Sequence, residues 1–284
     1  MNWSKRLTSF YLLLFTIVFA ICPPVQADED PLNHVVRIYH RSITNGMEVI
    51  AENLQGTDVT VLVDLSAENV ISEPPLPSQF VLEGHESKIV SRVLRDDPAQ
   101  SWRAGYTCHW CYGRTDAVQN PDAVYELPYA RGQKYLIVQG FHGSFSHKGQ
   151  DEYAIDFGMP EGSPVLACRA GQVVFVCSTY SAGGPTEYFR NRVNTVRIKH
   201  DDGTIAEYCH FRLNGLTVHE GDQVTGGQRI GYSGHTGFAA GPHLHFLVYR
   251  AADAYHREGY PIVFNVEGQE QPVVLEKGKT YVAP

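Results

Sequence analysis

Short runs that alternate between apolar and polar residues fill most of this chain, and helical periodicity is scarce throughout. The runs are rich in Val, Ile, Tyr and Phe and lie between clusters of Gly, Pro, Asn and Asp. This pattern is typical of antiparallel strands joined by turns, in which every second side chain points to the same face of a sheet. The sequence therefore predicts an all-β protein.

The first group of runs, between residues 35 and about 95, predicts a small N-terminal β-sandwich. Its strands are expected in VVRIYHRS, MEVIAEN, DVTVLVDL and SKIVSRVL. The intervening ISEPPLPSQF is expected to be a loop, because its prolines cannot lie in a central strand. Residues 113–133 are rich in turn formers, so we expect an N-terminal β-domain at residues 28–118 and a second β-rich domain at residues 119–284.

The first 27 residues have the pattern of an export signal. Lys5 and Arg6 precede an apolar run at residues 10–21, and VQA offers a small-residue cleavage site after Ala27. We therefore expect an exported mature chain, periplasmic or extracellular. The run is shorter than the roughly 18 residues of a membrane span, and no second apolar run follows, so no integral membrane segment is expected. Lipidation at Cys22 stays an alternative, although the preceding residue is bulkier than that motif favours.

The charge balance argues against a nucleic-acid partner. The full chain carries 23 Lys and Arg against 31 Asp and Glu, a formal charge of −8. Loss of Lys5 and Arg6 with the signal makes the charge of the mature chain more negative. Binding to a phosphate backbone requires a basic surface, which this composition does not favour.

Five cysteines remain after the expected cleavage: Cys108, Cys111, Cys168, Cys177 and Cys209. Export favours disulfides, and CHWC is expected to form a local one between Cys108 and Cys111. A four-cysteine zinc site would need a second CxxC motif, and a thioredoxin-like redox pair would need a βαβ context. The sequence has neither. The odd total leaves at least one cysteine unpaired within a monomer.

Two expected strands of the second domain carry histidines. In GPHLHF, alternation places His243 and His245 on one face with Leu244 behind them in the core. In TIAEYCHF, His210 lies near the end of a strand. Neighbours on a strand point to opposite faces, so Cys209 cannot easily pair with His210 as a nucleophile.

A third segment, SHKGQDEYAIDF, holds His147 with two possible partners, Asp151 and Asp156. A zinc hydrolase needs three protein ligands, an open position for water and a proton acceptor. The histidines of the three segments and one aspartate supply that set. Surface or packing roles are expected for His34, His40 and His85. Loop or surface positions are expected for His142, His200, His219, His235 and His256, with His235 also a candidate to line a substrate groove.

Four blocks, in order, resemble a known family: AIDFGMPEGSPVLACRAGQVV, EYCHF, VHEGDQVTGGQRIG and GYSGHTGFAAGPHLHF. Over residues 135–250 the chain looks like the lysostaphin/LytM-type zinc metallopeptidases, which are murein endopeptidases with a duplicated-hybrid-motif-like β fold. The resemblance implies a LytM-type peptidase domain, one Zn²⁺ per chain and a peptidoglycan peptide as substrate.

The resemblance also implies roles for individual residues. The family's zinc ligands correspond to His147, an aspartate and His245. Its two histidines beside the metal-bound water correspond to His210 and His243. One of these would accept a proton and the other would help to stabilise the tetrahedral intermediate, and the sequence does not separate the two roles.

The spacing of the first motif leaves a choice of aspartate. HKGQD fits the family's frequent HxxxD spacing with Asp151. In the family, however, a glycine of a GTPV-like block typically follows the aspartate by six residues, and counting back from Gly162 gives Asp156. Asp156 also lies in the apolar YAIDF, whereas Asp151 lies in a polar stretch. We therefore predict Asp156 as the ligand and residues 148–155 as an inserted loop.

These expectations describe an exported zinc metalloendopeptidase that cuts peptide cross-links of bacterial peptidoglycan. The alternative is a non-catalytic LytM-like regulator or activator of another cell-wall hydrolase. All five site positions are filled, which favours the enzyme. A closed structural zinc site would need only four ligands, so a purely structural metal leaves part of this set without a purpose.

Overall fold

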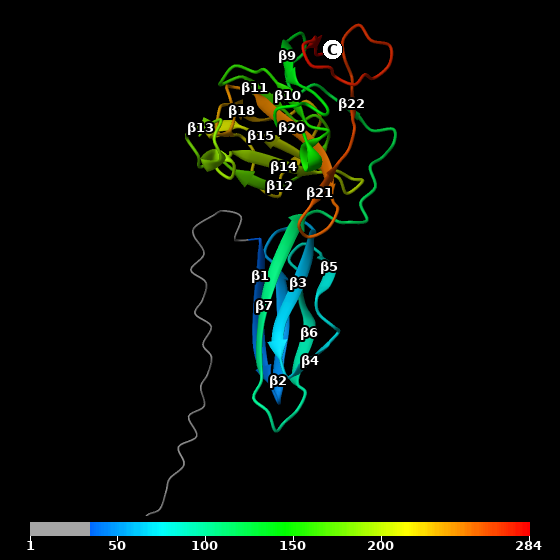
Figure 1. Ribbon diagram of the computed structural model, residues 1–284. Coiled ribbons are helices and arrows are strands. Elements are labelled where there is room, and N and C mark those ends of the chain that lie inside the picture. Colours follow the sequence, from blue (N-terminus) through cyan, green and yellow to red (C-terminus); the bar gives the residue numbers. More distant parts are fainter. Residues whose placement is uncertain (1–34) are drawn as a thin grey trace, which may run out of the picture. The chain divides into compact units, whose positions relative to one another are not determined.

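The computed structural model describes residues 35–284, and Figure 1 shows strands through most of this part. Its helical elements are two short 3-10 turns, η2 (Gly149–Asp151) and η3 (Glu187–Phe189). The all-β prediction is therefore confirmed. Within these residues, no helix has the length and apolar character that a membrane crossing requires. The expected export signal with its cleavage after Ala27, Cys22 and His34 lie outside the described residues.

Residues 36–112 form two antiparallel sheets. The first has the order β1-β2-β6-β4, with bounds Val36–Ile43, Gly46–Asn53, Ser87–Arg95 and Val70–Glu73. The second has the order β5-β3-β7, with bounds Ser78–Leu82, Val59–Glu68 and Arg103–Tyr112. Both sheets bury apolar side chains, among them Val49, Val61 and Val93.

The stretch ISEPPLPSQF, expected to be a loop, is a loop only in its centre. Its two ends belong to β4 and β5, and each of these strands lies at the edge of its sheet. Proline is tolerated at edge strands and strand ends, where its missing N–H breaks no ladder. The proline-rich residues 74–77 therefore interrupt strand formation without preventing it on either side, and the expectation of a continuous loop was wrong.

Residues 124–284 are organised by a nine-stranded antiparallel sheet. Its order is β17-β12-β14-β15-β20-β10-β9-β23, and β21 pairs with β20. The bounds in that order are Gln223–Val224, Gly171–Cys177, Thr195–Lys199, Ile205–Cys209, Leu244–Ala251, Ile155–Phe157, Lys134–Gln139 and Thr280–Val282, with Arg257–Gly259 for β21.

Three smaller sheets accompany the large one. The first has the order β11-β18-β16, with bounds Pro164–Leu166, Arg229–Ser233 and Phe211–Leu216. The other two are the parallel pairs β13 (Gly183–Gly184) with β19 (Gly237–Phe238) and β22 (Val263–Phe264) with β8 (Val124–Tyr125).

The register of the large sheet separates a core face from a polar face. Phe246 of β20 lies opposite Ile155 of β10 and Tyr208 of β15, and all three side chains are fully buried. The preceding residue, His245, lies opposite Asp156. Paired residues share a face and neighbours along a strand alternate, so His245 and Asp156 project together away from the core.

The five cysteines of the described residues are free thiols, so the expected disulfide between Cys108 and Cys111 is not formed. Both residues lie on β7, which pairs with β3 along its whole length. Residues three positions apart on a strand point to opposite faces, so the two sulfurs are held apart. The CHWC motif was read from local spacing, whereas a long strand pairing decides its conformation.

Glu207 of β15 is a buried acid held between two arginines. It accepts hydrogen bonds from Arg197 Nε at 2.6 Å and from Arg257 Nη1 at 2.5 Å. Arg257 also forms an ion pair with Asp151 of η2. Burial by itself raises the pKa of Glu207, but the charges of the two arginines outweigh it and hold that pKa well below its ordinary value. The acid is therefore charged in the folded protein.

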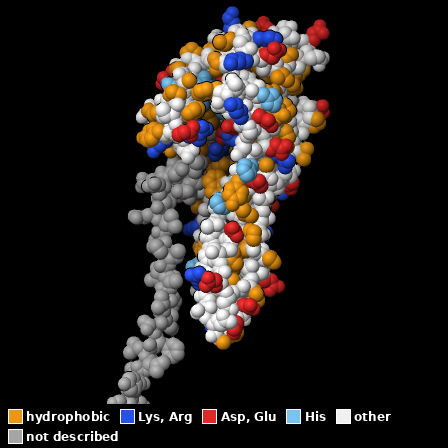
Figure 2. Space-filling model, viewed as in Figure 1, with side chains coloured by type: hydrophobic (Ala, Val, Ile, Leu, Met, Phe, Trp, Pro, Cys, Tyr) orange, Lys and Arg blue, Asp and Glu red, His pale blue; other side chains and the backbone are white. Residues whose placement is uncertain are grey.

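Glu207→Gln is expected to lower the free energy of unfolding by about 3–5 kcal/mol, because it leaves two largely buried guanidinium groups without their carboxylate. Exposed charged pairs offer a control, because acidic and basic side chains are interspersed over the face shown in Figure 2. Glu187→Gln breaks an exposed pair with Arg190 and should cost far less, because water screens an exposed ion pair. Urea unfolding followed by circular dichroism measures both, and equal losses would contradict the expectation.

Candidate metal centre

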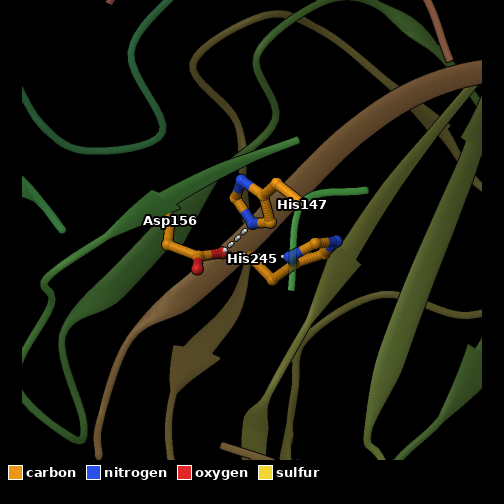
Figure 3. Close-up of side chains that lie close together, drawn as sticks. All are labelled: His147, Asp156 and His245. Carbon is orange, nitrogen blue, oxygen red and sulfur yellow. Dashed lines mark hydrogen bonds and ion pairs between the residues drawn. The ribbon is translucent and has the colours of Figure 1, made fainter. Parts of the chain in front are cut away.

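Two neighbouring strands and the loop between β9 and β10 bring together three side chains of the types that can bind a metal (Figure 3). Asp156 comes from β10, His245 from β20 and His147 from the loop. One ligand atom of each lies within 4.8 Å of those of the other two. Asp156 Oδ1 is 3.1 Å from His147 Nε2 and 2.9 Å from His245 Nδ1. The three residues predicted from sequence as metal ligands therefore converge on one point.

The tautomer of His147 is set by its backbone partner. Its ring is fully buried, and Nδ1 donates to the carbonyl oxygen of Gly140 at 2.8 Å. A carbonyl only accepts, so Nδ1 carries the hydrogen and Nε2 of the neutral ring holds a lone pair. Nε2 faces the Asp156 carboxylate and has no other partner in the described part of the chain. Two acceptors that face each other in a buried site call for a cation or a proton between them, which fits a metal.

The electrostatics of Asp156 and His245 point the same way. Burial by itself raises the pKa of Asp156, but its interactions with His147 and His245 outweigh burial and hold that pKa well below its ordinary value. Burial lowers the pKa of His245, and the hydrogen bond and charge of Asp156 outweigh it and raise that pKa. The site is thus built around a persistent negative charge, which attracts a cation.

His210 and His243 lie beside this group. Their ring centroids are 4.4 Å apart, and His243 Nε2 is 3.8 Å from Asp156 Oδ1. His210 Nδ1 donates to the Thr236 carbonyl at 2.6 Å and His243 Nδ1 to the Gly241 carbonyl at 2.9 Å. Each ring therefore keeps Nε2 free to accept a proton.

Burial keeps both of these rings neutral. It lowers the pKa of His210 to about 3, with help from the charges of His243 and His245, and it lowers the pKa of His243. His210 also has a φ of +74°, a left-handed conformation that a non-glycine residue rarely adopts. Such strain collects at functional sites, where the surrounding structure holds it.

Asp151, the aspartate that fits HxxxD, lies elsewhere. It belongs to η2, inside the stretch predicted as an inserted loop, and forms an ion pair with Arg257. It is not among the residues that could share a metal with His147. The structure therefore gives Asp151 a role as an anchor for the loop.

Most of the remaining histidines lie where the sequence predicted. His40, His85, His142, His219 and His256 are exposed, and His235 is half-buried with Nε2 3.1 Å from the Ala239 carbonyl oxygen.

His200 was predicted as a loop or surface residue; it lies in the loop directly after β14, as predicted, but it is buried rather than at the surface. Its side chain is 2% exposed, Nδ1 donates to the Ala170 carbonyl, and burial lowers its pKa to about 4. The signal was present in NTVRIKH, because His200 continues the alternation of Val196 and Ile198, which face the core.

Sequence reasoning missed one polar neighbour of the site. Gln139 Nε2 donates to Asp156 Oδ2 at 3.1 Å. It ends the otherwise unremarkable strand KYLIVQ, and nothing in that pattern marks a glutamine as part of a site.

Comparison with known proteins finds a likeness to one family of peptidases. Residues 150–257 match the model of Peptidase family M23. This part of the chain is therefore similar to the peptidases of that family. It contains Asp156, His210, His243 and His245, and His147 lies just before it. The resemblance to LytM-type metallopeptidases is thereby confirmed.

The M23 part has relatives in several bacteria. The chain is 40% identical over 126 residues to peptidoglycan DD-endopeptidase ShyA of Vibrio cholerae, covering 44% of this chain and 26% of that protein. It is 36% identical over 98 residues to glycyl-glycine endopeptidase ALE-1 of Staphylococcus capitis, covering 34% and 24%. The catalytic domain of lysostaphin from Staphylococcus simulans is 27% identical, with 45% of this chain and 87% of that one covered and a TM-score of 0.32. The matches thus span about a quarter of the curated relatives' length.

Proposed function

We propose that this protein is an exported zinc metalloendopeptidase that hydrolyses peptide cross-links of bacterial peptidoglycan. The observation that carries the proposal is the convergence of His147, Asp156 and His245 beside two further neutral imidazoles. The substrate class follows the relatives, which are named as a peptidoglycan DD-endopeptidase and a glycyl-glycine endopeptidase.

In this proposal His147 Nε2, Asp156 Oδ1 and His245 Nδ1 hold one zinc ion per chain. Two imidazole nitrogens and one carboxylate oxygen are a ligand set typical of catalytic zinc, which keeps its fourth position open. A zinc ion in such a site supplies a Lewis acid that activates water and polarises a peptide carbonyl.

In this proposal His210 and His243 accept and donate the proton during hydrolysis. Each has Nδ1 committed to a backbone carbonyl and Nε2 available. A ring that takes a proton at Nε2 becomes a donor there. It can then stabilise negative charge on the scissile carbonyl oxygen or pass the proton to the leaving amine. The fixed Nδ1 partners hold both rings in position for these roles.

Export and the domain boundary complete the proposal. Lys5, Arg6, the apolar run and VQA support a signal that is cleaved after Ala27. An exported hydrolase would reach peptidoglycan outside the cytoplasmic membrane. We place the N-terminal β-domain at residues 28–118 and the peptidase domain at residues 119–284.

The wild-type chain is expected to hold about one zinc ion and to release new free amino groups from peptidoglycan of known cross-link type. A chelator should abolish the release and added zinc should restore it, because the metal is the group that activates water in this proposal. Metal analysis and amino-group labelling measure the two quantities. Zinc without release would favour the non-catalytic regulator, and absence of both would overturn the proposal.

A further inference from the structure

Gln139 lies beside the proposed metal centre as the last residue of β9. It pairs with Asp156 across the β9–β10 ladder, and its side chain is 5% exposed. Paired residues share a face, so Gln139 extends the row that Asp156 and His245 form on the polar side of the sheet.

The two ends of the Gln139 amide make different contacts. Oε1 accepts from the backbone N–H groups of Phe145 at 3.1 Å and Ser146 at 3.3 Å. Nε2 donates to Asp156 Oδ2 at 3.1 Å and to Ser146 Oγ at 2.8 Å. Backbone N–H groups only donate and a carboxylate only accepts, so these partners leave one orientation for the amide. Both lone pairs and both hydrogens of the amide are used.

This arrangement gives the two carboxylate oxygens of Asp156 different partners. Oδ2 is bound by Gln139, while Oδ1 is the oxygen that faces His147 and His245. A carboxylate held in this way presents a single oxygen to a metal instead of two. Outer hydrogen bonds of this kind orient metal ligands and tune their affinity.

The loop that carries His147 packs directly on Gln139. A Cβ added to Gly143 would lie 2.2 Å from Gln139 Cγ, so only glycine allows the loop to sit this close. The same loop supplies the Gly140 carbonyl that orients His147, and His147 N donates to the Gly143 carbonyl. Gln139 therefore touches both Asp156 and the loop of His147.

We infer that Gln139 is a positioning residue that holds Asp156 to one-oxygen ligation and ties the His147 loop to the same amide. The inference rests on the proposed metal site. It assigns Gln139 no contact with substrate. Gln139 affects metal binding by positioning two proposed ligands, His147 and Asp156, which lie nine positions apart in the sequence.

Gln139→Met tests this, because it keeps the length of the side chain and removes both ends of the amide. Zinc affinity, measured by chelator competition on the full chain, should fall about 10–100-fold. The visible absorption of the Co²⁺-loaded protein should change, because the second oxygen of Asp156 is released. Gln150→Met is the matched control. Gln150 is exposed and accepts a hydrogen bond from Arg257 N in the inserted loop, so neither quantity should move.

Gly143→Ala perturbs Gln139 from the loop that carries His147, because the added Cβ would clash with the Gln139 side chain. This variant should displace Gln139 and change the cobalt spectrum in the same way. If both variants keep wild-type zinc affinity and cobalt spectrum, or lose only thermal stability, Gln139 is merely structural and the inference is overturned. If the wild type itself holds no zinc, the proposed function fails first and the inference fails with it.

Discussion

Asp156→Asn should lose zinc, whereas Asp151→Asn should keep it. Asp156 Oδ1 lies within 3.1 Å of one nitrogen from each of two histidines, and its replacement leaves two imidazoles and a neutral, weaker amide oxygen to hold the metal. Loss of a hydrogen bond to a ligand costs about 10–100-fold in affinity, so loss of a ligand charge should cost more than about 100-fold. Asp151 instead pairs with Arg257 and does not belong to the group that could hold the metal, so loss of its charge removes no ligand.

The two variants form a matched pair, because each exchanges one carboxylate for an amide within five residues. Zinc content after dialysis against a weak chelator gives the result, and circular dichroism checks that each variant is folded. Cleavage of peptidoglycan should follow zinc content. Zinc retained by Asp156→Asn and lost by Asp151→Asn would reverse the assignment and restore the HxxxD reading.

Strand alternation predicted a large part of the candidate site. It is a local property, so HLHF and YAIDF indicate which side chains share a face without reference to their neighbours. Asp156 lies between Ile155 and Phe157, which are both fully buried, and so it must project from the opposite face. The apolar context that favoured Asp156 over Asp151 in the sequence is the same context that holds its carboxylate rigidly in the fold.

Alternation does not encode which strands lie next to each other. Gln139 reaches Asp156 because β9 pairs with β10, and His245 reaches it because β20 pairs with the other edge of β10. The resemblance to a family predicted the contact between His245 and Asp156, because both correspond to zinc ligands of that family. No such motif marked Gln139, so its contact with the site emerged only from the register of the sheet.

The errors in the sequence reading have the same origin. CHWC was judged by the spacing of two cysteines, but the pairing of β7 with β3 keeps Cys108 and Cys111 on opposite faces. His200 was judged by the turn that follows it, and it does lie in a loop, but its side chain continues the buried face of β14 instead of lying at the surface. In both cases a local motif was weighed above the longer strand pattern in which it lies.

His243→Ala and His210→Ala should each lower kcat about 10²–10⁴-fold while zinc stays bound, because neither ring belongs to the group that could hold the metal. Both rings keep a free Nε2 beside that group, and burial holds both neutral and able to accept a proton. If the two act as one proton-handling unit, the double variant should be little slower than the slower single variant, since such effects are far from additive.

The measurement pairs zinc analysis with the rate of amino-group release at saturating peptidoglycan. His219→Ala is the control, because His219 is exposed and does not belong to the proposed site. This variant should leave zinc content and rate unchanged. Loss of zinc in His243→Ala would make that residue a ligand and force a different division of the five side chains. Wild-type turnover in both single variants would remove the proton carriers from the mechanism, and the strained φ of His210 would then need another explanation.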